Sequence, residues 1–202
     1  EDRARLLEAV AELPVDLLIN NAGLAHFGDL QDNPLEHERA MVEVNCLAPV
    51  LLTRALLPGM LTRCEAERRR GAVILLASTA AFFTLPRLTT YSASKAFDLH
   101  FAQGLAGELA DRPINVLALC PGPTRTAFFR RAGLSDMGML ARHSPEQVVR
   151  EGMAALGKRT VQVVGGRNRL AAMTTRLVPQ PLMMRVGVEW SKRRKRREAA
   201  AQ

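Results

Sequence analysis

The sequence predicts an α/β fold in which about four parallel strands form a doubly wound sheet flanked by helices. Two observations favour this class. Short aliphatic runs at residues 15–20, 71–78, 114–120 and 161–164 alternate with longer segments of helical periodicity. The runs are apolar throughout rather than alternating in polarity, as is typical of strands that helices cover on both faces.

Two helices flank the first strand. Residues 1–13 are expected to form an amphipathic helix with Leu6 and Leu13 on its apolar side. The strand at residues 15–20 is short and expected to be buried. A long helix over residues 33–61 begins with the dipeptide Asn-Pro, because asparagine can cap a helix and proline suits its first turn.

The second half of the chain continues this alternation. A helix over residues 89–110 separates the second and third strands, and Ser144 followed by Pro145 begins another helix. These elements define one domain over residues 1–164. Residues 165–202 form a C-terminal extension that ends in a basic tail.

Length and composition fit a single globular domain. The 202 residues are 48% hydrophobic, which is enough for one substantial core. No unbroken apolar run approaches the roughly 18 residues of a membrane span, and the first residues do not resemble a secretory signal. Cys46, Cys64 and Cys120 lack the paired spacing of a disulfide framework or a zinc site. We therefore expect a cytoplasmic protein without a bound metal.

The net charge of +8 is concentrated near the C-terminus. Residues 192–197 contribute six positive charges, and the rest of the chain holds 22 basic residues against 20 acidic ones. Apolar residues precede this run, so a weak contact of residues 165–197 with an anionic membrane surface is one interpretation. A solvated charged terminus is the simpler one. We predict no nucleic-acid partner, because no binding motif or aromatic interleaving accompanies the charges.

The stretch Tyr-Ser-Ala-Ser-Lys at residues 91–95 carries the clearest chemical signal. On a helix, Tyr91 and Lys95 share one face and point into the same pocket. A tyrosine hydroxyl has a pKa of about 10, and a neighbouring ammonium is expected to lower that pKa toward neutral pH. Ser78, at the end of the preceding strand, can hydrogen-bond the same substrate oxygen. These residues predict proton transfer to or from a hydroxyl or carbonyl group.

Further motifs extend this pattern along the chain. Asn-Asn-Ala-Gly at residues 20–23 closes the first strand, and Asn45 lies within the long helix. Pro-Gly-Pro-Thr-Arg-Thr at residues 121–126 follows the third strand. In order and spacing, these features resemble the short-chain dehydrogenase/reductase family. The resemblance extends to about residue 164 and implies a partial Rossmann-like fold, the C-terminal portion of the family's sheet.

The resemblance implies an NAD(P)-dependent oxidoreductase that interconverts an alcohol and a ketone or aldehyde. In that reaction Tyr91 is the acid and base, Lys95 holds the phenolate and the nicotinamide ribose, and Ser78 orients the substrate oxygen. Asn45 binds a water that links Lys95 to solvent, through a locally bent helix; its alternative is a polar residue that faces solvent. The implied cofactor-binding residues are Tyr91 and Lys95 together with Asn20, Ala22, Gly23, Pro121, Gly122, Thr124 and Thr126.

The chain departs from the family at the phosphate-binding turn. Relatives carry a Gly-rich turn after their first strand, whose N–H groups hold the pyrophosphate. No Gly-x-Gly triplet occurs here. Glu1 corresponds to the helix before the family's fourth strand, so the residues that choose between NAD and NADP are expected to lie outside this chain. We expect the 202-residue chain to bind cofactor weakly and its first strand to present an open apolar edge.

Substrate and partners follow from neighbouring segments. Residues 124–143 lie where relatives carry a mobile substrate-covering segment. Its bulky apolar side chains suit an apolar alcohol or carbonyl compound, with packing under a loop as the alternative. These side chains are Phe128, Phe129, Met137, Met139 and Leu140. Relatives commonly pair through their two long helices, so the full-length protein is expected to be a homo-oligomer. The rival to an enzyme is an inactive fragment or noncatalytic interaction module that uses the exposed edge or the basic tail.

Overall fold

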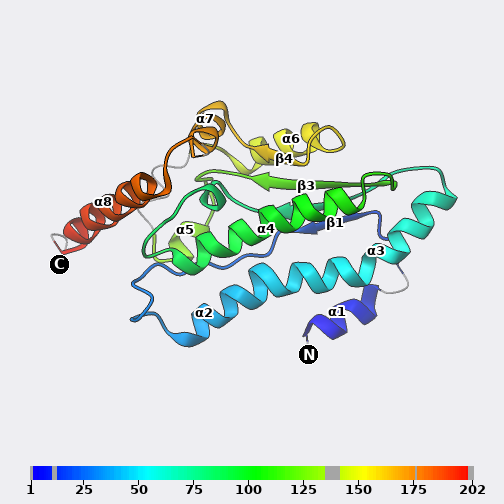
Figure 1. The fold of residues 1–202 in the computed structure, drawn as a ribbon. Helices are drawn as coiled ribbons and strands as arrows, with labels where there is room; N and C mark the ends of the chain where they lie inside the picture. Colours follow the sequence, from blue (N-terminus) through cyan, green and yellow to red (C-terminus); the bar gives the residue numbers. More distant parts are fainter. Residues whose placement is uncertain (1, 11–12, 135–141, 176, 200–202) are drawn as a thin grey trace.

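The computed structural model contains one parallel sheet with helices on both faces (Figure 1). It describes residues 2–10, 13–134, 142–175 and 177–199. The strands lie side by side in chain order: β1 (Leu17–Asn20), β2 (Gly71–Leu76), β3 (Ile114–Cys120) and β4 (Val161–Val163). Every neighbouring pair is parallel, which confirms the predicted fold class.

Two long helices cover one face of the sheet. The first is continuous through α2 (Leu35–Val42), the π-helical turn η1 (Glu43–Leu47) and α3 (Ala48–Ala66), so it ends five residues beyond the predicted Leu61. The second is α4 (Thr89–Glu108). Their inner side chains form one apolar core with the strands, and its most buried members are Met60, Cys64, Val73, Leu75, Ala102, Ala118 and Cys120.

The opposite face of the sheet is covered by α6 (Pro145–Ala155). Ser144 caps this helix, because its Oγ accepts a hydrogen bond from the Gln147 N–H at 3.2 Å. The predicted start of the helix is therefore confirmed. A second buried cluster forms between helix and sheet, with Val148 and Leu117 among its members.

The N-terminal elements are more exposed than the sequence suggested. In α1 (Asp2–Val10) and the turn after it, Leu6 and Leu13 are 48% and 57% exposed. In β1, Leu17 and Ile19 are 40% and 51% exposed, so the prediction of a buried strand is wrong. Within the described residues β1 pairs only with β2, and its other edge faces outward.

The continuous helix Leu35–Ala66 is long and apolar enough, by length and composition, to cross a membrane. The sequence prediction considered only unbroken apolar runs and overlooked this helix, in which polar residues interrupt the apolar ones. Its inner side packs against the sheet through Met60 and Cys64. A single helix of this kind, with 22% of its most apolar window buried, is weak evidence for a membrane span.

The extension after residue 164 is helical and packs on the domain. It consists of α7 (Gly166–Thr174) and α8 (Gln180–Ala199). A Cβ atom added to Gly187 in α8 would lie 2.6 Å from the carbonyl oxygen of Thr84, so only glycine permits this close approach. The contact brings Trp190 against Phe27, with the ring centroids 6.2 Å apart.

Asp16 fixes the start of β1 to the helix α3 and to the turn after it. Its carboxylate accepts from Arg63 Nε at 2.9 Å and from Arg69 Nη1 at 2.7 Å. Hydrogen bonds from Arg69 and Arg63 lower the pKa of Asp16 from 3.8 to about 2. Because the folded-state pKa is depressed, this group stabilises the fold above its unfolded pKa, and the contribution is lost as pH falls toward about 2.

Replacing Asp16 with Asn is therefore expected to lower the thermal unfolding midpoint at pH 7 and to lower it much less at pH 2, where most of the contribution of the carboxylate is lost. The effect is modest, because the carboxylate is 42% exposed and solvent screens it. Circular dichroism melts of both proteins across this pH range measure the difference. Asp32→Asn, at an exposed position, is the matched control. An equal deficit at both pH values would contradict the assignment.

Candidate active site

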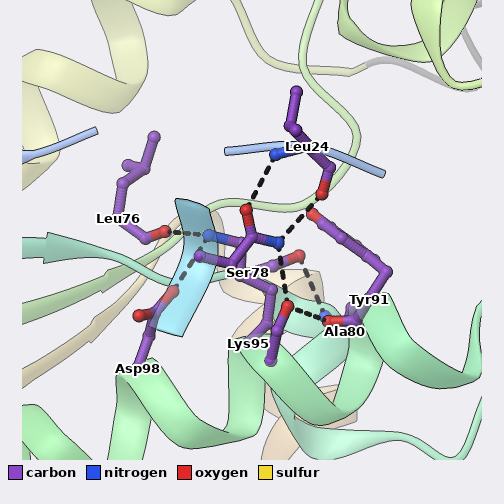
Figure 2. Close-up of polar contacts among 9 residues, drawn as sticks. Leu24, Leu76, Ser78, Ala80, Tyr91, Lys95 and Asp98 are labelled. Atoms are coloured by element: carbon purple, nitrogen blue, oxygen red, sulfur yellow. Dashed lines mark hydrogen bonds and ion pairs between the residues drawn. The ribbon is translucent and has the colours of Figure 1, made fainter. Parts of the chain in front are cut away.

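Four segments meet at the carboxyl edge of the sheet. The loop after β1 carries residues 20–24, Ser78 follows β2, residues 121–126 follow β3, and α4 carries Tyr91 and Lys95. Figure 2 shows Ser78, Tyr91 and Lys95 gathered beside Leu24. Parallel strands end at the same edge, which is why motifs distant in the sequence come together there.

Asn45 lies at the centre of the π-helical turn and is completely buried. Its Oδ1 accepts from the Leu24 N–H at 2.8 Å, and its Nδ2 donates to the Leu24 carbonyl at 2.9 Å and to Ser94 Oγ at 2.9 Å. The alternative of a solvent-facing polar residue is therefore wrong. The irregular helix predicted at Asn45 is present as a π turn, a feature that often marks functional positions.

The ammonium of Lys95 is buried and held on two sides. Nζ donates to the Leu76 carbonyl at 2.8 Å and to Asp98 Oδ2 at 2.9 Å. A Cβ atom added to Gly23 would lie 3.4 Å from Nζ. The ammonium therefore lies beneath the loop after β1, within van der Waals contact of the position that a side chain at Gly23 would take.

Tyr91 departs from the electrostatic expectation. Burial raises the pKa of its hydroxyl from 10.0 to about 12, and the charge of Asp98 adds to the rise, whereas a hydrogen bond with Ser78 opposes it. The expected lowering of this pKa by Lys95 is not among the causes of the shift, and the charge that acts on the phenol is that of Asp98, which pairs with the ammonium. At neutral pH the phenol is thus protonated.

Ser78 joins β2 to the short 3-10 helix η2 (Thr79–Phe82). Its backbone is extended, and its Oγ accepts a hydrogen bond from the Ala80 N–H at 3.1 Å. The hydrogen bond to Tyr91 comes from this same hydroxyl. Ser78 is therefore oriented by the turn that follows it, with its hydroxyl beside the phenol.

The predicted cofactor residues after β1 divide into two kinds. Asn20 is buried and donates to Thr53 Oγ1 at 3.3 Å, which ties the strand end to α3. Ala22 is exposed, and Gly23 lies over Lys95. The structure thus gives Asn20 a contact inside the fold and leaves Ala22 and Gly23 at the surface of the site.

The residues after β3 form a compact turn. Thr124 Oγ1 donates to the Gly122 carbonyl at 2.9 Å, and Thr126 Oγ1 accepts from the Phe128 N–H at 3.3 Å. A Cβ atom on Gly122 would lie 2.5 Å from Asn168 Nδ2. Pro121 is half-buried. The turn brings β3 close to α7 and leads into the short helix α5 (Phe128–Arg131).

Aromatic side chains pack around the ring of Tyr91. The ring centroid of Phe128 lies 5.7 Å from that of Tyr91, and Phe129 packs edge-on against Phe128. Phe129, Trp190 and Tyr91 belong to one apolar cluster around buried Leu134. Met137, Met139 and Leu140 lie outside the described residues.

Three contributors were not identified from the sequence. Asp98 and Ser94 lie on α4 and contact Lys95 and Asn45, and Trp190 lies in the C-terminal extension. Helical spacing gave a usable signal for Asp98, because it is three residues after Lys95 and seven after Tyr91. Nothing in the sequence pattern indicated that Trp190 reaches this region.

Comparison with known proteins agrees with this geometry. A family model described as short chain dehydrogenase matches residues 2–136, which is more than half of the chain. The chain belongs to the short-chain dehydrogenase/reductase family. Dehydrogenase/reductase SDR family member 7B of Bos taurus is 34% identical over 158 residues, covering 74% of this chain and 47% of that protein. Dehydrogenase/reductase SDR family member 4 of Bos taurus is 39% identical over 133 residues, covering 64% and 46%. The chain spans about half the length of these curated relatives.

Solved structures of short-chain dehydrogenases share the fold. One from Burkholderia cenocepacia J2315 in complex with NADP has a TM-score of 0.75 and 28% identity, over 91% of this chain and 73% of that one. One from Sphingobium yanoikuyae in complex with NADPH has a TM-score of 0.69 and 26% identity, over 91% and 70%. The similarity therefore covers the sheet and the helices on both of its faces.

The burial of Tyr91 can be measured directly, because it is the only tyrosine in the 202-residue chain. With a pKa of about 12, only roughly a tenth of the phenol is expected to ionise at pH 11 in the folded protein. Tyrosinate absorbance against pH, with circular dichroism to confirm folding, gives the midpoint. The same titration in guanidinium chloride is the control and should centre on the ordinary value of 10.0. Ionisation near pH 10 in the folded state would contradict the burial.

Proposed function

We propose that the protein is an NAD(P)-dependent oxidoreductase that interconverts an alcohol and a ketone or aldehyde. The observation that carries the proposal is the placement of Tyr91, Lys95 and Ser78 on one side of the loop after β1, with Asn45 buried behind it. The side chains of Tyr91, Lys95 and Ser78 carry groups that can donate a proton or a hydrogen bond to a hydroxyl or carbonyl oxygen. Family membership and the nicotinamide nucleotides in related structures support the same class.

The described residues fit the nicotinamide half of such a cofactor. The loop after β1 and the turn after β3 lie at the carboxyl edge of the sheet, on either side of the end of β2, where ligands bind in sheets of this kind. Gly23 leaves the Lys95 ammonium close to the surface of the loop, so that Lys95, Ala22 and Gly23 would hold the ribose. Pro121, Gly122, Thr124 and Thr126 would approach the nicotinamide.

When bound, the nicotinamide supplies or accepts the hydride. For reduction, the Tyr91 hydroxyl donates its proton to the carbonyl oxygen, and Ser78 donates a hydrogen bond that fixes this oxygen beside the phenol. In oxidation the same residues act in reverse. A phenol that stays protonated at neutral pH is ready to act as the acid.

Lys95 and Asn45 complete the proton path in this proposal. Lys95 stabilises the phenolate that remains after proton transfer, because its ammonium lies one helical turn from Tyr91. Asn45 fixes the distance between the loop after β1 and α4, because it forms hydrogen bonds to Leu24 in the loop and to Ser94 in the helix. A water held beside this amide would connect the ammonium with solvent.

The substrate proposed is a small apolar alcohol or carbonyl compound. Phe128 lies against the ring of Tyr91, and Phe129 and Trp190 continue the apolar surface. Such side chains favour an apolar substrate body, whereas the polar groups are confined to the reacting oxygen. The described residues thus separate an apolar wall from the polar catalytic groups.

Homo-oligomer formation is proposed through the two long helices. Leu47 and Leu51 on the first helix and Phe97 on α4 are 42%, 41% and 39% exposed. Phe97 stacks on Phe101 with the rings nearly parallel. A second copy would cover these apolar side chains.

A second candidate role, contact with a membrane surface from the cytoplasm, is favoured by α8. Its exposed apolar residues include Leu182, Met184 and Val186, and the exposed cations Lys192 and Arg193 follow them. Apolar side chains beside positive charge suit the interface of an anionic bilayer. This role is compatible with an enzyme, and equally with a noncatalytic interaction module.

Replacing Tyr91 with Phe in the full-length protein is expected to preserve the fold and to reduce kcat by about 10²–10⁴-fold, because the general acid is lost. Steady-state reduction of a panel of apolar ketones with NADPH and NADH measures this. Ser92→Ala is the matched control, since it removes a neighbouring hydroxyl that donates to the Thr89 carbonyl within the same helix. Turnover retained by Tyr91→Phe would overturn the assigned acid.

The chain is expected to float with vesicles that contain anionic lipid and to be released by added salt, because the attraction is electrostatic. Flotation with purely zwitterionic vesicles is the control. Charge reversal of Lys192 and Arg193 to Glu should abolish the binding. Equal recovery with both vesicle types, or none with either, would end the membrane proposal.

A further inference from the structure

The buried carboxylate of Asp98 is the feature of the site that the family motifs do not include. Asp98 is 2% exposed and lies on α4, on the same face as Tyr91 and Lys95. Its Oδ2 accepts from Lys95 Nζ at 2.9 Å, and both side chains are almost fully buried. Figure 2 shows the carboxylate on the side of the ammonium away from Tyr91.

The ion pair restricts where the Lys95 ammonium can point. An ammonium has three N–H groups, and two of them are directed to Asp98 and to the Leu76 carbonyl. No third partner of Nζ is present among the described residues, and the loop at Gly23 is its near neighbour. The remaining N–H therefore faces the loop side of the site.

Stability alone is a weak reason for a carboxylate at this position. The second oxygen of Asp98, Oδ1, is buried without a hydrogen-bond partner in the described part of the chain. Burial raises the pKa of Asp98, whereas the charge and the hydrogen bond of Lys95 oppose the rise. A buried ion pair with an unsatisfied oxygen is commonly no more stable than apolar side chains of the same size.

We propose that Asp98 is a positioning residue that aims the Lys95 ammonium at the loop after β1 and cancels much of its charge at Tyr91. Through this pair the charge of Asp98 adds to the effect of burial on the Tyr91 phenol, which favours proton donation, that is, reduction of a carbonyl compound. The direction of reaction rests on the proposed function, whereas the electrostatic effect on the phenol does not.

The other titratable groups that face the Asp98–Lys95 ion pair add no charge near Tyr91 at physiological pH. Cys46 of the π turn and Cys120 of β3 both sense the charges of Asp98 and Lys95. Burial raises the pKa of each thiol, for Cys120 to about 12. Both thiols are therefore neutral at physiological pH, and the charge that acts on Tyr91 is that of Asp98, which is paired with Lys95.

The test is the titration of the sole tyrosine in the chain with Asp98 replaced by Asn, a change that keeps the shape and removes the charge. The midpoint of tyrosinate absorbance is expected to fall by about one pH unit, a roughly tenfold rise in the proton dissociation constant, because the ammonium is no longer neutralised. Asp98→Glu restores the charge and should titrate like the parent. Should the Asn variant fail to fold by circular dichroism, Asp98→Leu provides a second uncharged side chain of similar size.

A double-substitution cycle identifies Lys95 as the mediator. In a Lys95→Met background, Asp98→Asn is expected to lower the Tyr91 midpoint by less than in the parent, because it removes only the direct repulsion by the Asp98 carboxylate and no ammonium remains to turn toward the phenol. An unchanged midpoint in the single variant, or an equal fall in both backgrounds, would overturn the proposal.

Kinetics of the full-length protein give an independent readout. Asp98→Asn should move the pH profile of alcohol oxidation to lower pH and leave the profile in Asp98→Glu in place. A tyrosine midpoint that shifts in a protein without turnover would refute the proposed function and support the electrostatic role. Turnover with an unshifted midpoint would do the reverse.

Discussion

The buried amide of Asn45 is the constraint on which the site depends. Three of its hydrogen-bonding positions are occupied by groups from outside its own helix, two on Leu24 and one on Ser94. The amide therefore fixes the distance between the loop after β1 and α4, and Lys95 lies in the space that this distance leaves. Unsatisfied amide groups are costly when buried, so a change in any of the three partners would disturb the loop, the π turn and α4 together.

The protonation state of Tyr91 depends on the competing effects of burial, hydrogen bonding and nearby charge. Burial favours the neutral form of Tyr91, and Ser78 opposes this by hydrogen bonding. Lys95 would oppose it as well, but its charge is shared with Asp98 at 2.9 Å. The result is a phenol that keeps its proton at neutral pH. In the proposed reaction, a protonated phenol suits the role of the acid better than that of the base.

The sequence predicts strands more reliably than it predicts environments. The strand at Ile114–Cys120 is found at the predicted residues, because a short apolar run indicates a strand from the local sequence alone. The open apolar edge of the first strand was expected from the sequence, whereas the description of that strand as buried was wrong, because the exposure of Ile19 depends on which neighbours lie beside β1. The protonation of Tyr91 was missed for a related reason. The position of Asp98 is visible in the helical spacing, but only the packing of α4 on the sheet shows that its charge is buried and paired with Lys95.

In this arrangement, the residues that set the pKa of Tyr91 are different from the residues that determine the affinity for a nucleotide cofactor. The protonation of Tyr91 is set by burial, by Ser78 and by Asp98, and both of these side chains are held by contacts inside the described fold, Asp98 through Lys95. Pyrophosphate and adenosine are normally bound by a Gly-rich turn, and this sequence contains no Gly-x-Gly. Binding energy from remote parts of a ligand positions the reacting part but does not create the acid. The raised pKa of the Tyr91 phenol should therefore be present in this chain whether or not a nucleotide binds. Substitutions far from α4 that change the affinity for nucleotide should leave the pKa of Tyr91 unaltered.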